Sequence, residues 1–123
     1  GLLLFVGIGR GDGEKDADRL AAKISGLRIF GDDNGKMNRS ILDVDGQVLL
    51  VSQFTLHADC SRGNRPGFES AERPERARTL VNQLAEAIAC RGITVRTGVF
   101  GADMSVSLTN DGPVTILLDT ATM

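Results

Sequence analysis

Few residues in this chain have the types and spacing that conventional side-chain catalysis requires. His57 is the sole histidine, and histidine is the usual general base near neutral pH. If residues 47–57 form one strand, Ser52 and His57 point to opposite faces, because they are an odd number of residues apart. Thr55 shares a face with His57 but lies beside it along the strand. The spacing argues against a Ser–His nucleophile, and we expect His57 to be packed or solvated.

Metal and cofactor chemistry find little support in the sequence. Cys60 and Cys90 form no CxxC pair, and with one histidine they cannot supply the usual ligand count of a zinc site. Unpaired thiols are typical of a reducing compartment. We therefore expect no metal, no cofactor and a cytoplasmic protein.

The glycine-rich run GIGRGDG at residues 7–13 invites comparison with nucleotide-binding loops. The GxGxxG fingerprint would need glycine at position 12 or 14, where the chain has Asp12 and Glu14. The P-loop pattern also fails, since Phe30 and Met37 stand where it needs glycine and a hydroxyl residue. The run is interpreted as a flexible turn between a strand and a helix.

Two polar stretches remain as candidates for a site. Ser52-Gln53-Phe54-Thr55-Leu56 places three polar side chains in an otherwise apolar strand, and such groups need partners. They serve either strand-end hydrogen bonding or a binding site. Asn110-Asp111-Gly112-Pro113 lies between two alternating segments. It is either a plain turn or a turn whose Gly-Pro bond is cis and presents its carbonyl groups outward.

The elements that would position these stretches follow from hydrophobic periodicity. Apolar residues at helical spacing predict two helices, one from an N-cap at Asp12 to Gly26 and one from Pro74 to Gly92. Between the strand within residues 47–57 and the second helix, the polar residues 59–75 are expected to form a long loop. Strands are expected at residues 2–8, within 47–57, and at 93–98, 103–109 and 114–119.

Composition bounds the fold and its partners. Leu, Ile, Val and Phe supply 35 of the 123 residues, enough for a packed core. The order of elements predicts a compact single domain over residues 1–123, of the α/β class, with mixed and antiparallel β-sheets and two main helices. A net charge of −2 argues against a protein that coats DNA. No apolar run is long enough to span a membrane.

Several stretches taken together resemble one family across essentially the whole chain. They are LLLFVGIGRGD, ADRLAAKISGLRIF, DDNGKMNRS, SQFTL, RPGF, FGADMSVSLTNDGPVT and the closing LLD. In this order they resemble D-aminoacyl-tRNA deacylase, which removes D-amino acids from tRNA. The resemblance implies a compact α/β deacylase-like fold, a homodimer, and the 3′ acceptor end of charged tRNA as partner.

The resemblance also implies roles for particular residues. Ser52, Gln53, Phe54 and Thr55 match the strand motif at the floor of the family's catalytic pocket. Gly112 and Pro113 match the Gly-cisPro motif, which reaches into the partner subunit's pocket and excludes L-aminoacyl groups there. Glycine escapes such a filter, so glycyl-tRNA is an implied second substrate. Hydrolysis would use the tRNA's own terminal ribose hydroxyl, with backbone N–H groups as the oxyanion site.

Two departures from the family pattern bear on this expectation. The family usually begins with a further strand segment, which carries a basic residue that supports the Gly-Pro loop, and this chain begins after it. The chain thus reads as N-terminally truncated relative to the family. Position 57 is His where the family more often has an aromatic hydroxyl residue, a change expected to matter little.

Contacts to the tRNA are expected from basic loop residues near the polar motifs, namely Lys36, Arg39, Arg62 and Arg65. The acidic net charge is compatible with this, because only the end of the tRNA need be held. The alternative interpretation is a non-catalytic dimeric binding module or an inactive truncated relative, in which SQFTL is structural and Gly112-Pro113 only a turn.

Overall fold

A three-stranded parallel sheet forms the centre of the computed structural model, which describes residues 1–123. Its strands β1 (Leu2–Val6), β4 (Gln47–Ser52) and β5 (Thr94–Thr97) lie in the order β1-β4-β5. Strand β4 is the central strand, and its Val48, Leu50 and Val51 are almost fully buried, as expected for a parallel strand with a neighbour on each side. The parallel strands end at one edge of the sheet, where β1 and β4 leave Val6 and Ser52 side by side.

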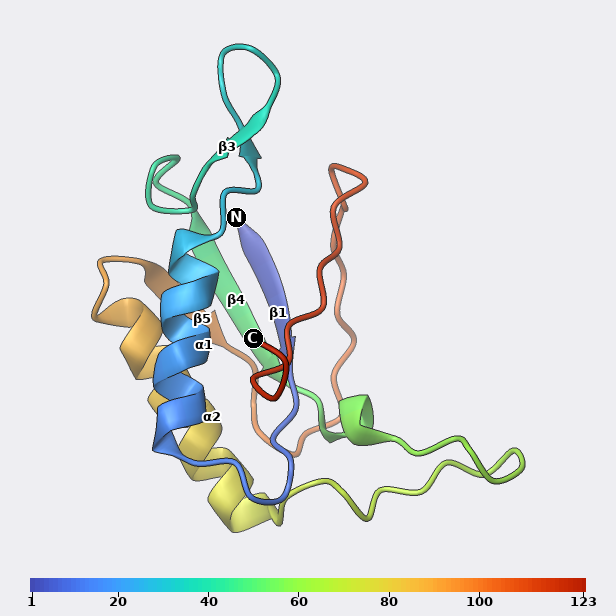
Figure 1. Ribbon diagram of the computed structural model, residues 1–123. Coiled ribbons are helices and arrows are strands. Elements are labelled where there is room, and N and C mark those ends of the chain that lie inside the picture. The colour runs from blue at the N-terminus through green and yellow to red at the C-terminus, as the bar shows by residue number, and fades with distance from the viewer.

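Two helices, α1 (Glu14–Gly26) and α2 (Pro74–Ala89), pack against each other and cover one face of this sheet (Figure 1). Their apolar stripes meet the inward residues of β1 and β4, as the helical spacing predicted. The core that results contains Val6, Ala17, Ala21, Ile24, Ile41, Val48, Leu50, Val81, Leu84, Ile88 and Ile93. Two helices on parallel strands confirm the predicted α/β class.

The helix boundaries follow the sequence signals with one exception. Helix α2 has Pro74 in its first turn, and Gly92 follows its end with a φ of 89°. Helix α1 is not capped by Asp12, as predicted. Gly13 is the N-cap, and its N–H donates to Asp16 Oδ2 at 2.8 Å. The Asp12 carboxylate instead accepts the Gly9 N–H at 2.8 Å and so tightens the glycine-rich turn.

A small antiparallel hairpin, β2 (Phe30–Gly31) and β3 (Met37–Arg39), extends from the end of α1. Its turn lies at residues 32–35, where the sequence Asp-Asp-Asn-Gly is typical of a turn and Asp32 Oδ1 accepts the N–H groups of Asn34 and Lys36 at 2.9 Å. These hydrogen bonds lower the pKa of Asp32, together with a bond from the Asn38 amide that contributes most.

The strand expected within residues 47–57 stops at Ser52. Gln53 N–H donates to Val6 O at 2.8 Å, after which the chain turns into a 3₁₀ helix, η1 (Phe54–His57). The neighbouring strand β1 also ends at this level, so there is no partner with which a longer strand could pair. Phe54, Thr55 and His57 therefore occupy a helical turn rather than alternate faces of a strand.

The C-terminal strands are predicted correctly only in part. Residues 93–98 contain β5, but 103–109 and 114–119 are not strands, although the chain doubles back between them (Figure 1). Alternating apolar residues favour an extended backbone, whereas a strand also needs a neighbour to bond with. Residues 103–109 and 114–119 thus form two extended C-terminal arms that share no backbone hydrogen bond. One weak side-chain hydrogen bond, from Asn110 Nδ2 to Thr115 Oγ1 at 3.3 Å, forms near the turn between them. Neither helix is long and apolar enough to cross a membrane.

Candidate substrate site

A cavity of about 710 Å³ opens where β1 and β4 end. Ligands of parallel α/β sheets usually bind outside the carboxyl ends of the strands. Four segments line it: the turn after β1, the end of β4 with the start of η1, residues 68–77 at the start of α2, and residues 100–106 after β5. Its volume lies in the range of small-molecule sites.

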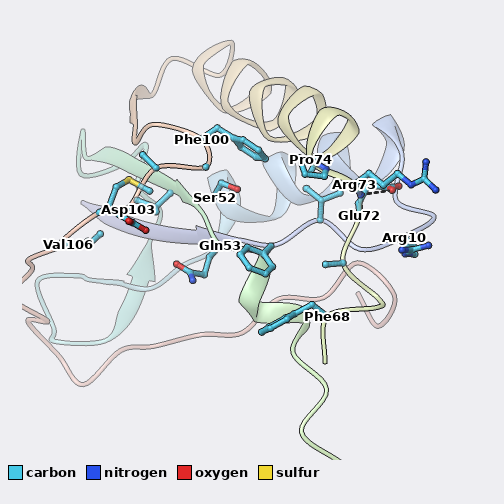
Figure 2. A pocket seen from close by; sticks show the side chains of 18 residues that line it. Arg10, Ser52, Gln53, Phe68, Glu72, Arg73, Pro74, Phe100, Asp103 and Val106 are labelled. Carbon is cyan, nitrogen blue, oxygen red and sulfur yellow. Dashed lines mark hydrogen bonds between the residues drawn. The ribbon is translucent and has the colours of Figure 1, made fainter. Parts of the chain in front are cut away.

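Three of the four residues predicted for the catalytic motif meet in this cavity. Ser52, Gln53 and Phe54 line it, whereas Thr55 does not. Thr55 is linked to the cavity through Gln53, because its Oγ1 accepts a hydrogen bond from Gln53 Nε2. Figure 2 shows Ser52 and Gln53 on the side of the cavity nearest the sheet.

Two phenylalanines form an exposed aromatic pair beside the motif. The rings of Phe54 and Phe68 lie edge to face, 5.1 Å apart and inclined by 66°. They are 57% and 37% exposed, which is unusual for large apolar residues and typical of a binding surface. Phe68 was not predicted as a site residue. Its place in the quoted RPGF stretch was the available signal.

Phe68 is held by the base of the predicted long loop. Asp59 and Gly67 exchange backbone hydrogen bonds of 2.7 and 2.9 Å, which close the loop below its tip. The Ser61 hydroxyl, and then the Ser61 N–H, lower the pKa of Asp59 by hydrogen bonding to its carboxylate. Beyond this closure the loop projects far from the domain (Figure 1).

The four predicted tRNA contacts are not brought together. Arg62 and Arg65 belong to the tip of the projecting loop, whereas Lys36 and Arg39 belong to the β2–β3 hairpin at the other end of the molecule (Figure 1). None of the four lines the cavity. Arg39 is also engaged by Asp33, at 3.0 Å.

Two other arginines, Arg10 and Arg73, line the cavity instead. They come from segments 63 residues apart, which a short antiparallel bridge between Gly9 and Ala71 holds together. Arg10 N–H donates to Ser70 O, and Glu72 N–H to Ile8 O, both at 2.9 Å. Sequence reasoning missed both arginines because nothing local indicates that these two loops pair.

Gly112 and Pro113 are joined by a cis peptide bond at the tip of the C-terminal segment. A Cβ at Gly112 would overlap the backbone nitrogen of Val114, so this turn needs glycine. Neither residue lines the cavity of its own chain. The tip and the end of β4 lie at different ends of the molecule (Figure 1).

His57 does not pair with Ser52. Its imidazole packs against the glycine-rich turn and lines a second cavity of about 350 Å³ between β1, α1 and residues 117–120. No three His, Cys, Asp or Glu side chains gather closely enough to hold a metal ion, and both cysteines are free and exposed. The main cavity offers hydroxyl, amide, aromatic, guanidinium and carboxylate groups.

Comparison with known proteins identifies the family. Residues 1–119 match the family described as D-Tyr-tRNA(Tyr) deacylase. The D-aminoacyl-tRNA deacylase of Paracoccus denitrificans (strain Pd 1222) is 59% identical over 121 residues, which cover 98% of this chain and 81% of the relative.

Solved structures have the same fold. One described as c-Myc DNA Unwinding Element Binding Protein superposes with a TM-score of 0.86 at 37% identity, over 94% of this chain and 79% of that chain. A probable eukaryotic D-amino acid tRNA deacylase superposes with a TM-score of 0.77 at 14% identity, over 92% and 81%. The family match and the Paracoccus relative, both covering nearly the whole chain, show that this chain belongs to the D-Tyr-tRNA(Tyr) deacylase family.

Proposed function

We propose that this chain hydrolyses the ester bond between a D-amino acid and the 3′ end of tRNA. Membership of the deacylase family makes it a hydrolase. The observation that carries the proposal is the meeting of Ser52, Gln53 and Phe54 with Phe68 in one cavity at the carboxyl edge of the sheet. The rings of Phe54 and Phe68 could stack on a base, and the polar groups of Ser52 and Gln53 could bind a ribose and an ester. These are the parts of an aminoacylated terminal nucleoside.

The hydrolysis is proposed to depend on positioning rather than on a strong side-chain base. An aminoacyl ester is already activated, and no histidine faces Ser52. The terminal ribose hydroxyl of the tRNA would assist attack by water. N–H groups at the start of η1, which have no carbonyl partner within the turn, are the candidate oxyanion donors. Gln53, held by Thr55, would orient the ribose.

Selection of the D-form is assigned to Gly112 and Pro113 of a second subunit, following the family resemblance. Within one chain these residues lie away from the cavity, so a homodimer is needed to bring them to it. The exposed area supports such a dimer. The chain exposes 8553 Å², whereas a compact monomer of 13.1 kDa exposes about 6400 Å². The excess is of the size that permanent dimers bury.

Glycyl-tRNA is proposed as a second substrate, because a filter that excludes the side chain of an L-amino acid has nothing to exclude in glycine. The exposed free thiols of Cys60 and Cys90 favour a reducing, cytoplasmic location.

The direct test compares release of amino acid from D-tyrosyl-tRNA, L-tyrosyl-tRNA and glycyl-tRNA, together with the oligomeric state by sedimentation. We expect release from the D-form and from glycyl-tRNA, retention of the L-form, and a dimer. Binding of all three without release would favour the alternative, a non-catalytic binding module or inactive relative. Equal release of both enantiomers would disprove the assigned chiral filter.

A further inference from the structure

Four arginines come from two segments that meet at one side of the cavity, and two of them, Arg10 and Arg73, line it. Arg10 comes from the turn after β1, and Arg73, Arg76 and Arg78 come from the start of α2. The four arginines differ in whether their guanidinium groups contact other groups of the chain. Arg76 donates to Asp12 O at 2.9 Å and lies 3.5 Å from Glu72 Oε2. Arg78 lies over the ring of Phe100, 5.1 Å from its centroid.

Arg10 and Arg73 have no such partner. Both are exposed, both line the cavity, and neither guanidinium makes an ion pair or a side-chain hydrogen bond within the chain. Figure 2 shows them on one side of the cavity, with Ser52, Gln53 and Asp103 toward the other side. The two guanidinium groups are therefore free to bind a ligand.

The nearby carboxylates do not neutralise this pair. Glu72 is the acidic residue closest in sequence, but its side chain is only 13% exposed. It accepts the Arg73 N–H at 2.8 Å and faces Arg76, so its charge is already compensated. Asp103 lies on the side of the cavity away from the two arginines (Figure 2). The cavity is thus cationic at one end and polar or acidic at the other.

We propose that Arg10 and Arg73 form an anion-binding rim that holds the phosphate groups of the tRNA acceptor end, an assignment that rests on the proposed deacylase function. Guanidinium groups bind phosphate oxygens through paired N–H donors. With the phosphates at this rim, the terminal base lies at Phe54 and Phe68, and the ester lies at Ser52 and Gln53. The strand enters over the start of α2, and the β2–β3 hairpin takes no part.

The test uses two substrates that differ in phosphate. D-tyrosyl-tRNA carries the acceptor-end phosphates, and 3′-O-(D-tyrosyl)adenosine carries none. For the double variant Arg10→Gln/Arg73→Gln we expect KM for D-tyrosyl-tRNA to rise about tenfold or more with kcat nearly unchanged. The kinetics of the nucleoside ester should not change. The dependence of log KM on log salt concentration should weaken by about 1.4, the value for two single-stranded phosphate contacts.

The matched control is Arg91→Gln, which removes the same charge from an exposed position beyond the other end of α2. It should change neither substrate. Arg10→Lys/Arg73→Lys should restore part of the affinity, since lysine keeps the charge and loses the paired geometry. The proposed rim would be wrong if the double variant raised KM equally for both substrates or left KM for D-tyrosyl-tRNA unchanged. It would also be wrong if Arg91→Gln raised KM for D-tyrosyl-tRNA by the same factor. Circular dichroism and thermal unfolding check that the variants are folded.

A binding measurement separates the rim from the proposed reaction. Fluorescence anisotropy with an oligoribonucleotide ending in CCA needs no turnover. If the wild-type protein hydrolyses neither ester but the double variant still binds the oligonucleotide about tenfold more weakly, the deacylase proposal fails and the rim stands. If hydrolysis is seen and oligonucleotide binding is the same in wild type and variant, the rim is wrong and the deacylase proposal stands.

Discussion

The imidazole of His57 lies so close to Gly9 that a Cβ at position 9 would come within 2.9 Å of its Cε1 atom. Gly7 is similarly close, since a Cβ there would meet His57 Cδ2 at 3.0 Å, Gln53 O at 3.1 Å and Leu56 Cβ at 3.1 Å. Gly7 and Gly9 of the run GIGRGDG thus make room for η1, which carries the end of the SQFTL motif. Close approach, rather than phosphate binding, explains glycine at these two positions.

This packing predicts different costs at the two glycines. Gly7→Ala should lower the free energy of unfolding by about 1–3 kcal/mol, because backbone and Cβ atoms that cannot move aside surround the added methyl group. Gly9→Ala should cost less, since it meets the tip of one ring. His57→Ala should suppress the cost of Gly9→Ala but not that of Gly7→Ala. Urea unfolding of the single and double variants measures these couplings; equal suppression at both positions would contradict the packing.

Thr55 is expected to act through Gln53. Thr55→Ala removes the acceptor of the Gln53 amide and should lower kcat/KM for D-tyrosyl-tRNA by about threefold to tenfold, the worth of one neutral hydrogen bond. Thr55→Ser keeps the hydroxyl group and should stay near wild type. Stability should change little because Thr55 is exposed. Complete loss of turnover in a folded Thr55→Ala protein would show instead that the hydroxyl takes part directly.

Met104 and Gly98 are expected to set the width of the cavity together. A Cβ at Gly98 would lie 2.7 Å from Met104 Sδ, and Met104 lines the cavity. Gly98→Ala should push the flexible thioether into the cavity and raise KM for D-tyrosyl-tRNA, at a stability cost near 1 kcal/mol. Adding Met104→Ala should reverse the KM effect. A KM that stays raised in the double variant would locate the effect elsewhere.

The start of α1 should respond to acid through Asp16. Its carboxylate accepts the Gly13 N–H, and this bond, more than the Thr120 hydroxyl and the charge of Arg19, lowers the pKa of Asp16 below its ordinary value of 3.8. The stabilisation is therefore fully present above pH 3.8 and is lost as the pH falls through the lower value in the folded protein.

Asp16→Asn tests this, because the amide oxygen can still accept the hydrogen bond but does not ionise. At pH 7 the variant should melt at a lower temperature than wild type, and the difference should shrink as the pH falls below 3.8. Thermal unfolding from pH 7 to pH 2 provides the measurement. If the difference in melting temperature between wild type and Asp16→Asn did not change with pH, the charge of Asp16 would contribute nothing to stability.

The sequence was sufficient where structure depends on local pattern. The faces of α1 and α2, Pro74 in the first turn of α2, and the hairpin turn at 32–35 all follow from spacing and residue type. Parts of the candidate site could also be predicted. The resemblance singled out Ser52, Gln53 and Phe54, and all three line the cavity, while their part in catalysis stays a prediction.

Sequence reasoning failed where a distant segment decides the outcome. Strand β4 ends at Ser52 because β1 ends beside it, and residues 103–119 are not strands because nothing pairs with them. Arg10 and Arg73 reach one cavity only because Gly9 pairs with Ala71, a contact that spacing along the chain does not reveal. Asp12 turned back to Gly9 instead of capping α1, a choice between two equally local hydrogen bonds.

The unpaired C-terminal arms give the molecule two very different amide lifetimes. Residues 48–50 of β4 are paired with β1 on one side and β5 on the other, so their amides exchange with solvent only when the core opens. Between residues 103 and 119 no backbone N–H finds a carbonyl acceptor in the chain. In an isolated chain these amides take up deuterium within the shortest labelling time, and their protection therefore records directly whether another surface has covered the arms.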